Sequence, residues 1–227
     1  MQHLLLLHGA IGAKSQFDPL IEKLKENYTI HTLNFSGHGG AEMPENFRIE
    51  LFASEVLEYL TKNNLNNINI FGYSMGGYVA LYIAKQHPEK MGRIFTLATK
   101  FEWNAEIAIN ETKMLNASKI AQKIPAFAEA LKKRHFPNDW IAILQKTAEM
   151  MVAMGNNNPI HLEDFRTISV PVRIAIGDQD VMVNLEETIA VYRKLPNASL
   201  TVFPATSHPI EKLNLNQLAF ELRMFFN

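Results

Sequence analysis

Short apolar runs recur along the chain, and each is followed by turn residues and then by a longer segment with apolar residues at helical spacing. The apolar runs predict six strands, at residues 3–7, 29–35, 68–71, 94–98, 172–176 and 200–203. The longer segments predict helices at about residues 15–26, 48–63, 75–87, 185–194 and 214–226. This alternation is typical of the α/β class, in which helices cover both faces of a mostly parallel sheet.

The connection between the fourth and fifth predicted strands is far longer than one crossover needs, since about 70 residues separate the two strands. Within it, prolines and an asparagine-rich turn separate helical patterns near residues 104–114, 117–121, 125–135 and 138–154. We therefore expect a helical cap at residues 101–167, inserted into a core formed by residues 1–100 and 168–227.

Composition and charge narrow the class of protein. The chain has 227 residues, of which 47% are hydrophobic, enough for one sizeable core. A formal net charge of -1 gives no long-range attraction for nucleic acid or an anionic membrane. With no cysteine and no apolar stretch near the roughly 20 residues of a membrane span, the simplest expectation is a cytoplasmic protein with a small-molecule substrate and no metal or cofactor. The oligomeric state is not predicted.

A serine between two glycines stands where the third strand meets the next helix. Ser74 is the centre of Gly72-Tyr73-Ser74-Met75-Gly76. The motif alone is weak, because a serine often simply caps a helix. A strand before it and a helix after it are the context that a nucleophile elbow requires, with glycines where the turn is too tight for side chains. The sequence therefore predicts Ser74 as a nucleophile.

A serine hydroxyl needs a base to remove its proton. His208 follows the last predicted strand, and loops at the carboxyl edge of a parallel sheet are where such folds place ligands. The base in turn needs a carboxylate to fix its tautomer. Two aspartates follow the fifth strand, and we favour Asp180 over Asp178, which is suited to bonding within its own turn.

The loop after the first strand, His8-Gly9-Ala10-Ile11-Gly12, reaches the same edge of the sheet. The backbone N–H groups of Ala10 and Met75 together make a two-donor oxyanion hole. His8 stands directly at the strand end, and this position favours a role in ordering the loop over a role as base.

The order Ser74, Asp180, His208, with a His-Gly pair after the first strand and a long insertion before the fifth, resembles the α/β-hydrolase superfamily over essentially the whole chain. The resemblance implies that Ser74, Asp180 and His208 form the catalytic triad and that Ala10 and Met75 form the oxyanion hole. One segment departs from the family, since Asn34 stands where an aspartate usually begins the pattern Asp-x-x-Gly-His-Gly.

The resemblance leaves several activities open. A serine at the elbow argues against haloalkane dehalogenases and soluble epoxide hydrolases, which carry an aspartate there. A serine hydrolase that cleaves a small apolar acyl ester is the first expectation. A lyase or carbon-carbon hydrolase that uses the triad as a base is the alternative, as is a non-catalytic ligand receptor.

The predicted cap supplies apolar side chains for a substrate pocket. The candidates are Phe101, Trp103, Trp140 and Met151. At helical spacing, packing of the cap onto the core is the commoner role for any one of them. The run 132–135, which reads Lys-Lys-Arg-His, is a candidate site for a substrate anion or a solvated helix face.

Overall fold

The computed structural model describes residues 1–227 and contains one sheet of six strands in the order β2-β1-β3-β4-β5-β6. Every neighbouring pair is parallel. The strands are β1 (Gln2–Leu7), β2 (Tyr28–Thr32), β3 (Ile68–Tyr73), β4 (Met91–Leu97), β5 (Val172–Gly177) and β6 (Ala198–Phe203). The predicted α/β class and six-stranded parallel sheet are confirmed.

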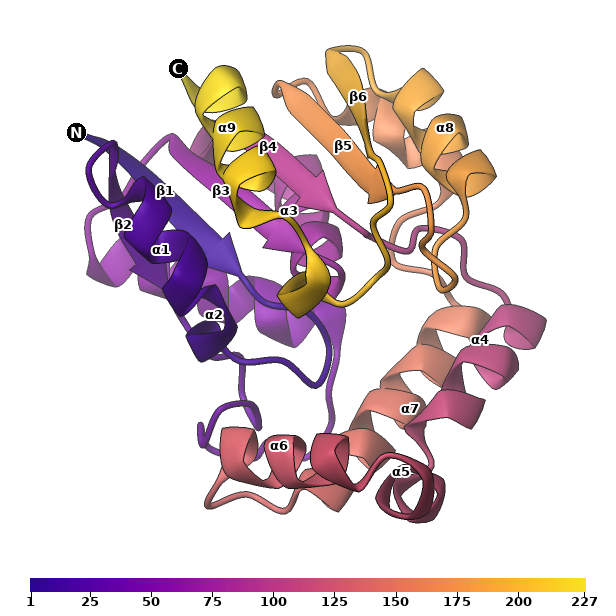
Figure 1. Cartoon of the computed structure of the whole chain (residues 1–227). Helices are drawn as coiled ribbons and strands as arrows, with labels where there is room; N and C mark the ends of the chain where they lie inside the picture. The colour runs from indigo at the N-terminus through magenta and orange to yellow at the C-terminus, as the bar shows by residue number, and fades with distance from the viewer.

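Helices cover both faces of the sheet (Figure 1). One face is packed by α2 (Ile49–Lys62), α3 (Met75–Gln86) and α8 (Leu185–Lys194), and the other by α1 (Asp18–Leu24) and α9 (Leu215–Phe226). Alternate residues of β1 serve the two faces, since Leu5 and Leu7 join the first cluster while Leu4 and Leu6 join the second. A strand buried on both sides reads as a continuous apolar run, and the sequence shows such a run here.

The second strand is shorter than its apolar run predicts, ending at Thr32 instead of residue 35. Beyond Thr32 the chain leaves the β-sheet because its polar groups bond to side chains and loops instead of to a neighbouring strand. The backbone N–H of Phe35 donates to His8 Nε2, and the Asn34 side chain accepts from Lys14 N and donates to Gly39 O. Side-chain bonds of this kind compete with a strand ladder.

Four helices lie between β4 and β5 in the sequence: α4 (Ala105–Thr112), α5 (Ala117–Lys123), α6 (Pro125–His135) and α7 (Trp140–Asn156). Capping residues separate them. Asn104, Asn116 and Asp139 each accept a hydrogen bond from a first-turn N–H, and Pro125 begins α6. The Asp139 cap explains why α7 begins two residues later than its helical pattern predicts.

These four helices gather on one side of the sheet, beyond the carboxyl ends of the strands (Figure 1). Helix α7 joins the main core through Ile143, Met150 and Met154, and a small cluster around Leu131 and Leu144 holds α5 and α6 to it. The helices therefore stand over the edge where the loops after β1, β3, β5 and β6 emerge. None of the helices in the chain is both long and apolar enough to cross a membrane.

Candidate active site

Ser74 occupies a strained turn between β3 and α3. Its φ and ψ are 52° and −119°, a region that a residue with a side chain rarely adopts. The flanking glycines make the turn sterically feasible, because a Cβ at Gly72 would lie 2.4 Å from Gly77 Cα and one at Gly76 would lie 2.2 Å from Leu7 O. Ser74 therefore stands at a sharp corner between the strand and the helix, where it is half-buried.

Hydrogen bonds hold this turn from both sides. Ser74 N donates to Leu97 O on β4 at 2.8 Å, and Ser74 O accepts from Gly77 N and from Thr99 Oγ1, both at 3.0 Å. The surrounding structure therefore determines the backbone conformation of Ser74, which is the condition under which strain of about 1–3 kcal/mol persists.

His208 and Asp180 meet across the loops that follow β6 and β5. His208 Nδ1 lies 2.8 Å from Asp180 Oδ2, and the aspartate side chain is fully buried. An ionised carboxylate only accepts, so Nδ1 carries the proton and Nε2 is the ring nitrogen left for the pocket. The other carboxylate oxygen, Oδ1, accepts from the backbone N–H groups of Met182 and Val183, both at 2.9 Å.

The second aspartate of the β5 loop has a different role. Asp178 is exposed, and its Oδ1 accepts from Thr206 N at 3.1 Å. This bond ties the loop after β5 to the loop after β6, and it places Asp178 in the turn and away from His208. Asp180 thus bonds to His208 and Asp178 bonds within the loops, which is the arrangement that the sequence favours.

A tyrosine at the end of β3 also holds the His208 loop in place. Tyr73, the last residue of β3, donates its hydroxyl to His208 O at 3.0 Å. Burial raises the pKa of Tyr73, so the phenol keeps the proton that this bond needs. The last residue before Ser74 therefore positions the histidine that shares its pocket.

Two backbone donors lie beside Ser74. Ala10 N, in the loop after β1, has no intramolecular acceptor. Met75 is the first residue of α3, where a backbone N–H has no partner within the helix. Both residues line the same cavity as Ser74 and His208. No hydrogen bond joins the Ser74 hydroxyl to His208 in this structure, and such bonds commonly form only when a substrate is present.

His8 is fully buried at the end of β1 and orders its loop. Its Nε2 accepts from Phe35 N at 3.1 Å, so Nδ1 carries the proton and donates to Gly9 O at 2.8 Å. Burial lowers the pKa of His8 to about 4. Both ring nitrogens are engaged, which leaves neither for proton transfer.

A third histidine, which the sequence offered only as part of a basic run, holds the inserted helices to the loops of the sheet. His135, at the end of α6, donates from Nε2 to Ile11 O at 2.9 Å and accepts from Gly39 N at 3.0 Å. Arg134 also donates to Ile11 O and pairs with Glu211 at 3.1 Å. Only Lys132 and Lys133 of this run are exposed.

The cavity beside Ser74 has a volume of about 50 Å³ and mostly apolar walls. The inserted helices and their leading loop contribute Trp103, Glu111, Met150, Met151 and Met154. A second cavity of about 200 Å³ lies on the other side of Ser74 and His208 and has Arg134, Gln16 and Glu211 in its wall. Met151 borders both cavities.

The four pocket residues suggested by the sequence divide into two pairs. Trp103 and Met151 line the cavity beside Ser74. Phe101 does not, because it is buried edge-to-face against Phe165, 5.6 Å between ring centroids, and borders a separate cavity. Trp140 does not either, since it begins α7 and packs on the small cluster around Leu131.

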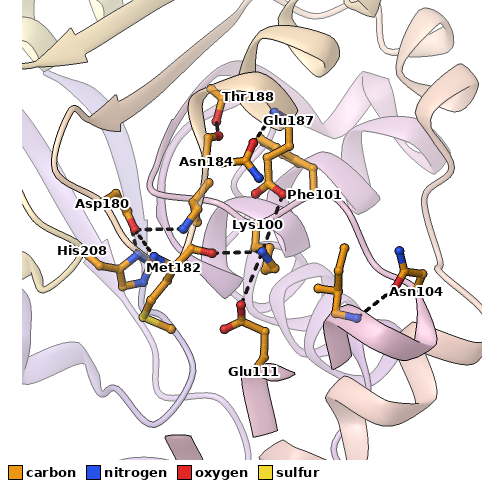
Figure 2. A network of polar contacts seen from close by, with 12 residues as sticks. Lys100, Phe101, Asn104, Glu111, Asp180, Met182, Asn184, Glu187, Thr188 and His208 are labelled. Carbon is orange, nitrogen blue, oxygen red and sulfur yellow. Dashed lines mark hydrogen bonds and ion pairs between the residues drawn. The ribbon is translucent and has the colours of Figure 1, made fainter. Parts of the chain in front are cut away.

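Sequence reasoning missed a charged cluster, drawn in Figure 2, in which Lys100 and Glu111 line this cavity and Glu187 lies behind them and borders the separate cavity beside Phe101. Lys100 Nζ donates to Met182 O at 3.0 Å and lies 3.5 Å from Glu111 Oε1 and 3.6 Å from Glu187 Oε2. Burial raises the pKa of Glu187 to about 7, and the nearby Lys100 ammonium opposes that rise. In the sequence these residues are three isolated charges on distant segments, and no motif links them.

The chain contains no group of three or more histidine, aspartate or glutamate side chains arranged to hold a metal ion. The polar groups around Ser74 are a hydroxyl, an imidazole paired to a carboxylate, and backbone donors. Such an arrangement is suited to nucleophilic attack on a carbonyl group and to stabilising the oxyanion that results.

The similarity to known proteins agrees with this geometry. A family model described as alpha/beta hydrolase fold matches residues 2–118. The pimeloyl-[acyl-carrier protein] methyl ester esterase of Neisseria meningitidis serogroup A (strain DSM 15465 / Z2491) is 28% identical to this chain, over 89% of the chain and 70% of that protein.

Solved structures share the fold at lower identity. The enol-lactonase from Burkholderia xenovorans LB400 superposes with a TM-score of 0.80 at 16% identity, over 99% of this chain and 90% of that one. A thermophilic esterase from Thermogutta terrifontis gives a TM-score of 0.79 at 19% identity, over 99% and 89%. With the family match covering half of its residues, the chain belongs to the α/β-hydrolase fold family and is an enzyme of the hydrolase class.

Proposed function

We propose that this hydrolase cleaves esters of small, mainly apolar acyl groups, with Ser74 as nucleophile, His208 as general base and Asp180 as the acid that orients it. The observation that carries the proposal is the 2.8 Å bond between His208 Nδ1 and Asp180 Oδ2, because it directs Nε2 of the imidazole to the cavity that Ser74 lines. The esterase activity of the Neisseria relative supports the same reaction class.

Acylation follows from the protonation pattern of the site. His208 Nε2 takes the proton of the Ser74 hydroxyl as Oγ forms a bond to the ester carbonyl carbon. The carbonyl oxygen becomes an oxyanion, and the N–H groups of Ala10 and Met75 stabilise it. The C–O bond to the leaving alcohol then breaks, and His208 returns its proton to the departing oxygen.

Deacylation reverses the roles. His208 Nε2 takes a proton from water as the water oxygen attacks the acyl carbon of the Ser74 ester. The same two N–H groups hold the second oxyanion, and the proton passes from His208 to Ser74 Oγ as the acid is released. Asp180 stays ionised throughout and stabilises the imidazolium formed in each half.

We also propose that residues 101–167 act as a cap over a core formed by residues 1–100 and 168–227. The contributions of Trp103, Met151 and Met154 to the cavity wall support this role. Such a wall shields the bound acyl group from bulk solvent, and flexible methionines let the wall adapt to small differences in acyl shape.

The test is the turnover of 4-nitrophenyl acetate by the wild type and by Ser74→Ala. We expect a burst of nitrophenol followed by steady turnover in the wild type, and a fall in kcat of at least about 10³-fold with no burst in the variant. A fluorophosphonate should add covalently to the wild type at Ser74 only, as seen by peptide mass.

Ser54→Ala is the matched control, because Ser54 is exposed on α2 and far along the chain from the site. It should retain the burst and the labelling. Unchanged turnover in Ser74→Ala would reject the proposal. Turnover of a carbon acid that survives without any labelling would instead assign the triad a role as a base, and binding without turnover would indicate a receptor.

A further inference from the structure

The ammonium of Lys100 lines the cavity beside Ser74, where an isolated lysine would attract a substrate carboxylate. It is not isolated. Oxygens of Met182, Glu111 and Glu187 lie 3.0, 3.5 and 3.6 Å from Nζ, as Figure 2 shows. Only the contact with Met182 O is a hydrogen bond, and the two carboxylates form ion pairs with Lys100, so its positive charge is already balanced before a ligand enters.

The charges in this cluster do not leave a positive excess. Lys100 contributes one positive charge, and Glu111 contributes one negative charge, with side chains only 15% and 13% exposed. Glu187 adds a further carboxylate whose side chain is 2% exposed and whose oxygens make no hydrogen bond. The cluster is therefore neutral when Glu187 is protonated and negative when it is ionised.

The rest of the cavity wall offers no compensating cation. Its remaining lining is apolar apart from Ser74, Tyr78 and His208. The nearest other cation, Arg134 in the wall of the second cavity, is already paired with Glu211. An acyl group that enters with its own carboxylate would lose hydration and meet Glu111, whose charge already neutralises Lys100. Burying a charge without a partner is strongly unfavourable.

We propose that Lys100, Glu111 and Glu187 form a charge filter that admits uncharged acyl groups to the cavity beside Ser74 and excludes acyl groups bearing a second carboxylate. The inference rests on the proposed ester hydrolysis and narrows its substrates to uncharged monoacyl esters. Lys100 thus serves to neutralise buried carboxylates in the wall and is not a receptor for a substrate anion.

The filter has a pH dependence set by Glu187. Burial raises the pKa of Glu187 to about 7, and the charged or titratable groups around it are Lys100, Glu102, Glu111 and His161. As the pH rises through about 7, Glu187 ionises and the cluster becomes negative. Discrimination against an anionic acyl group therefore strengthens with rising pH.

The experiment compares two esters of nearly equal size, ethyl levulinate and monoethyl succinate, in which a terminal acetyl group replaces a terminal carboxylate. Hydrolysis is followed by pH-stat, and an ester that is not turned over is scored by competitive inhibition of 4-nitrophenyl acetate hydrolysis. The readout is the ratio of kcat/KM, or of inhibition constants, for the two esters. Because both are measured on one enzyme at one pH, any pH dependence of the shared catalytic step cancels in the ratio.

We expect the wild type to prefer levulinate by at least about tenfold, and by more at pH 8.5 than at pH 5.5. Glu111→Gln removes one negative charge and should reduce this preference by about tenfold or more, and Glu187→Gln should remove its pH dependence. Glu106→Gln is the control, because Glu106 is an exposed carboxylate on the same helix as Glu111 that does not line this cavity, and it should leave the ratio unchanged.

Equal use of the two esters by the wild type would overturn the inference, as would an unchanged ratio in Glu111→Gln. Either result leaves the proposed function standing if Ser74→Ala still abolishes turnover of 4-nitrophenyl acetate. Full turnover in Ser74→Ala would reject the proposed function and the filter with it.

Discussion

Asp180 has both of its oxygens engaged, and this arrangement leaves His208 a single tautomer. Oδ1 accepts from two backbone N–H groups and Oδ2 from the imidazole, while the side chain is entirely buried. His208 is the only group beside Asp180 that can carry a balancing positive charge. The carboxylate therefore stabilises the imidazolium that forms when Nε2 takes up a proton. The effect of an isosteric change at Asp180 can therefore be predicted in detail.

Asp180→Asn should lower kcat with 4-nitrophenyl acetate by about 10³- to 10⁴-fold. The asparagine oxygen will face the two backbone N–H groups, so its NH₂ group will face His208 Nδ1. The imidazole must then accept at Nδ1 and carry its proton on Nε2, where it cannot act as a base toward Ser74. Steady-state kinetics with circular dichroism as a check on folding makes the measurement.

Asp178→Asn is the matched control, since Asp178 bonds only to Thr206 N and is exposed. Its amide oxygen can keep that bond, and kcat should stay within about threefold of the wild type. A large loss in this variant and little loss in Asp180→Asn would reverse the assignment of the two aspartates.

At the scale of elements, one buried side chain of α6 bonds to the loops after both β1 and β2. His135 bridges Ile11 O and Gly39 N, and burial lowers its pKa to about 4. Protonation would remove its acceptor nitrogen and break the bond from Gly39. The attachment of α6 is therefore sensitive to acid.

The unfolding free energy should decrease as the pH falls from about 6.5 to about 4. In that range the unfolded chain binds a proton at residue 135 and the folded chain does not, at about 1.4 kcal/mol per pH unit. His135→Gln, which can keep both bonds, should lose about 1–2 kcal/mol less than the wild type between pH 7.5 and 5.0. Urea unfolding of the wild type and the variant at pH 7.5 and pH 5.0 measures this difference. At pH 7.5 residue 135 is neutral in both states, so a difference there reports a change in the hydrogen bonds alone.

The elements were largely predictable, and the exceptions have local causes. Helices α2, α3, α8 and α9 agree with their helical patterns to within a residue at each end. Strand β2 ends early because His8 accepts from Phe35 N and the Asn34 side chain bonds to Lys14 N and Gly39 O, contacts that a hydrophobic pattern does not register. The sequence suggested Phe101 and Trp140 for the pocket, but apolar residues at helical spacing serve packing and pocket equally well.

The candidate site also has a part that the sequence predicts and a part that it does not. Ser74, Asp180 and His208 follow strands that end at one sheet edge, so their places after the strands were enough to predict that they lie close together. Lys100, Glu111 and Glu187 come from a loop and two helices whose docking depends on the tertiary structure. Contacts of that kind follow no sequence period or motif. They could therefore not be predicted from the sequence.

At the scale of the whole molecule, the cavity exists only where the inserted helices meet the sheet edge. Its volume of about 50 Å³ holds a few water-sized groups, at roughly 10–15 Å³ each. A short acyl group therefore fits, and a longer chain has to pass Met151, which borders both this cavity and the second one of about 200 Å³. The size of the substrate is thus decided by the junction of two parts of the chain.

We expect kcat/KM for 4-nitrophenyl esters to be highest at two to four acyl carbons and to fall by at least about tenfold at eight. Met151→Ala, which shortens a side chain bordering both cavities, should shift the optimum to longer chains. Val152→Ala is the control on the same helix, because Val152 is 42% exposed and lines neither cavity. An unchanged profile in Met151→Ala would mean that α7 does not set the limit.

The backbone of Ser74 also predicts how a glycine at this position would change stability. At a φ of 52° glycine is less strained than serine, so Ser74→Gly should return about 1–3 kcal/mol to a fold whose whole margin is about 5–15 kcal/mol. Stability alone would therefore favour glycine at this turn. A serine hydroxyl at so unfavourable a position fits a residue whose value lies in its chemistry.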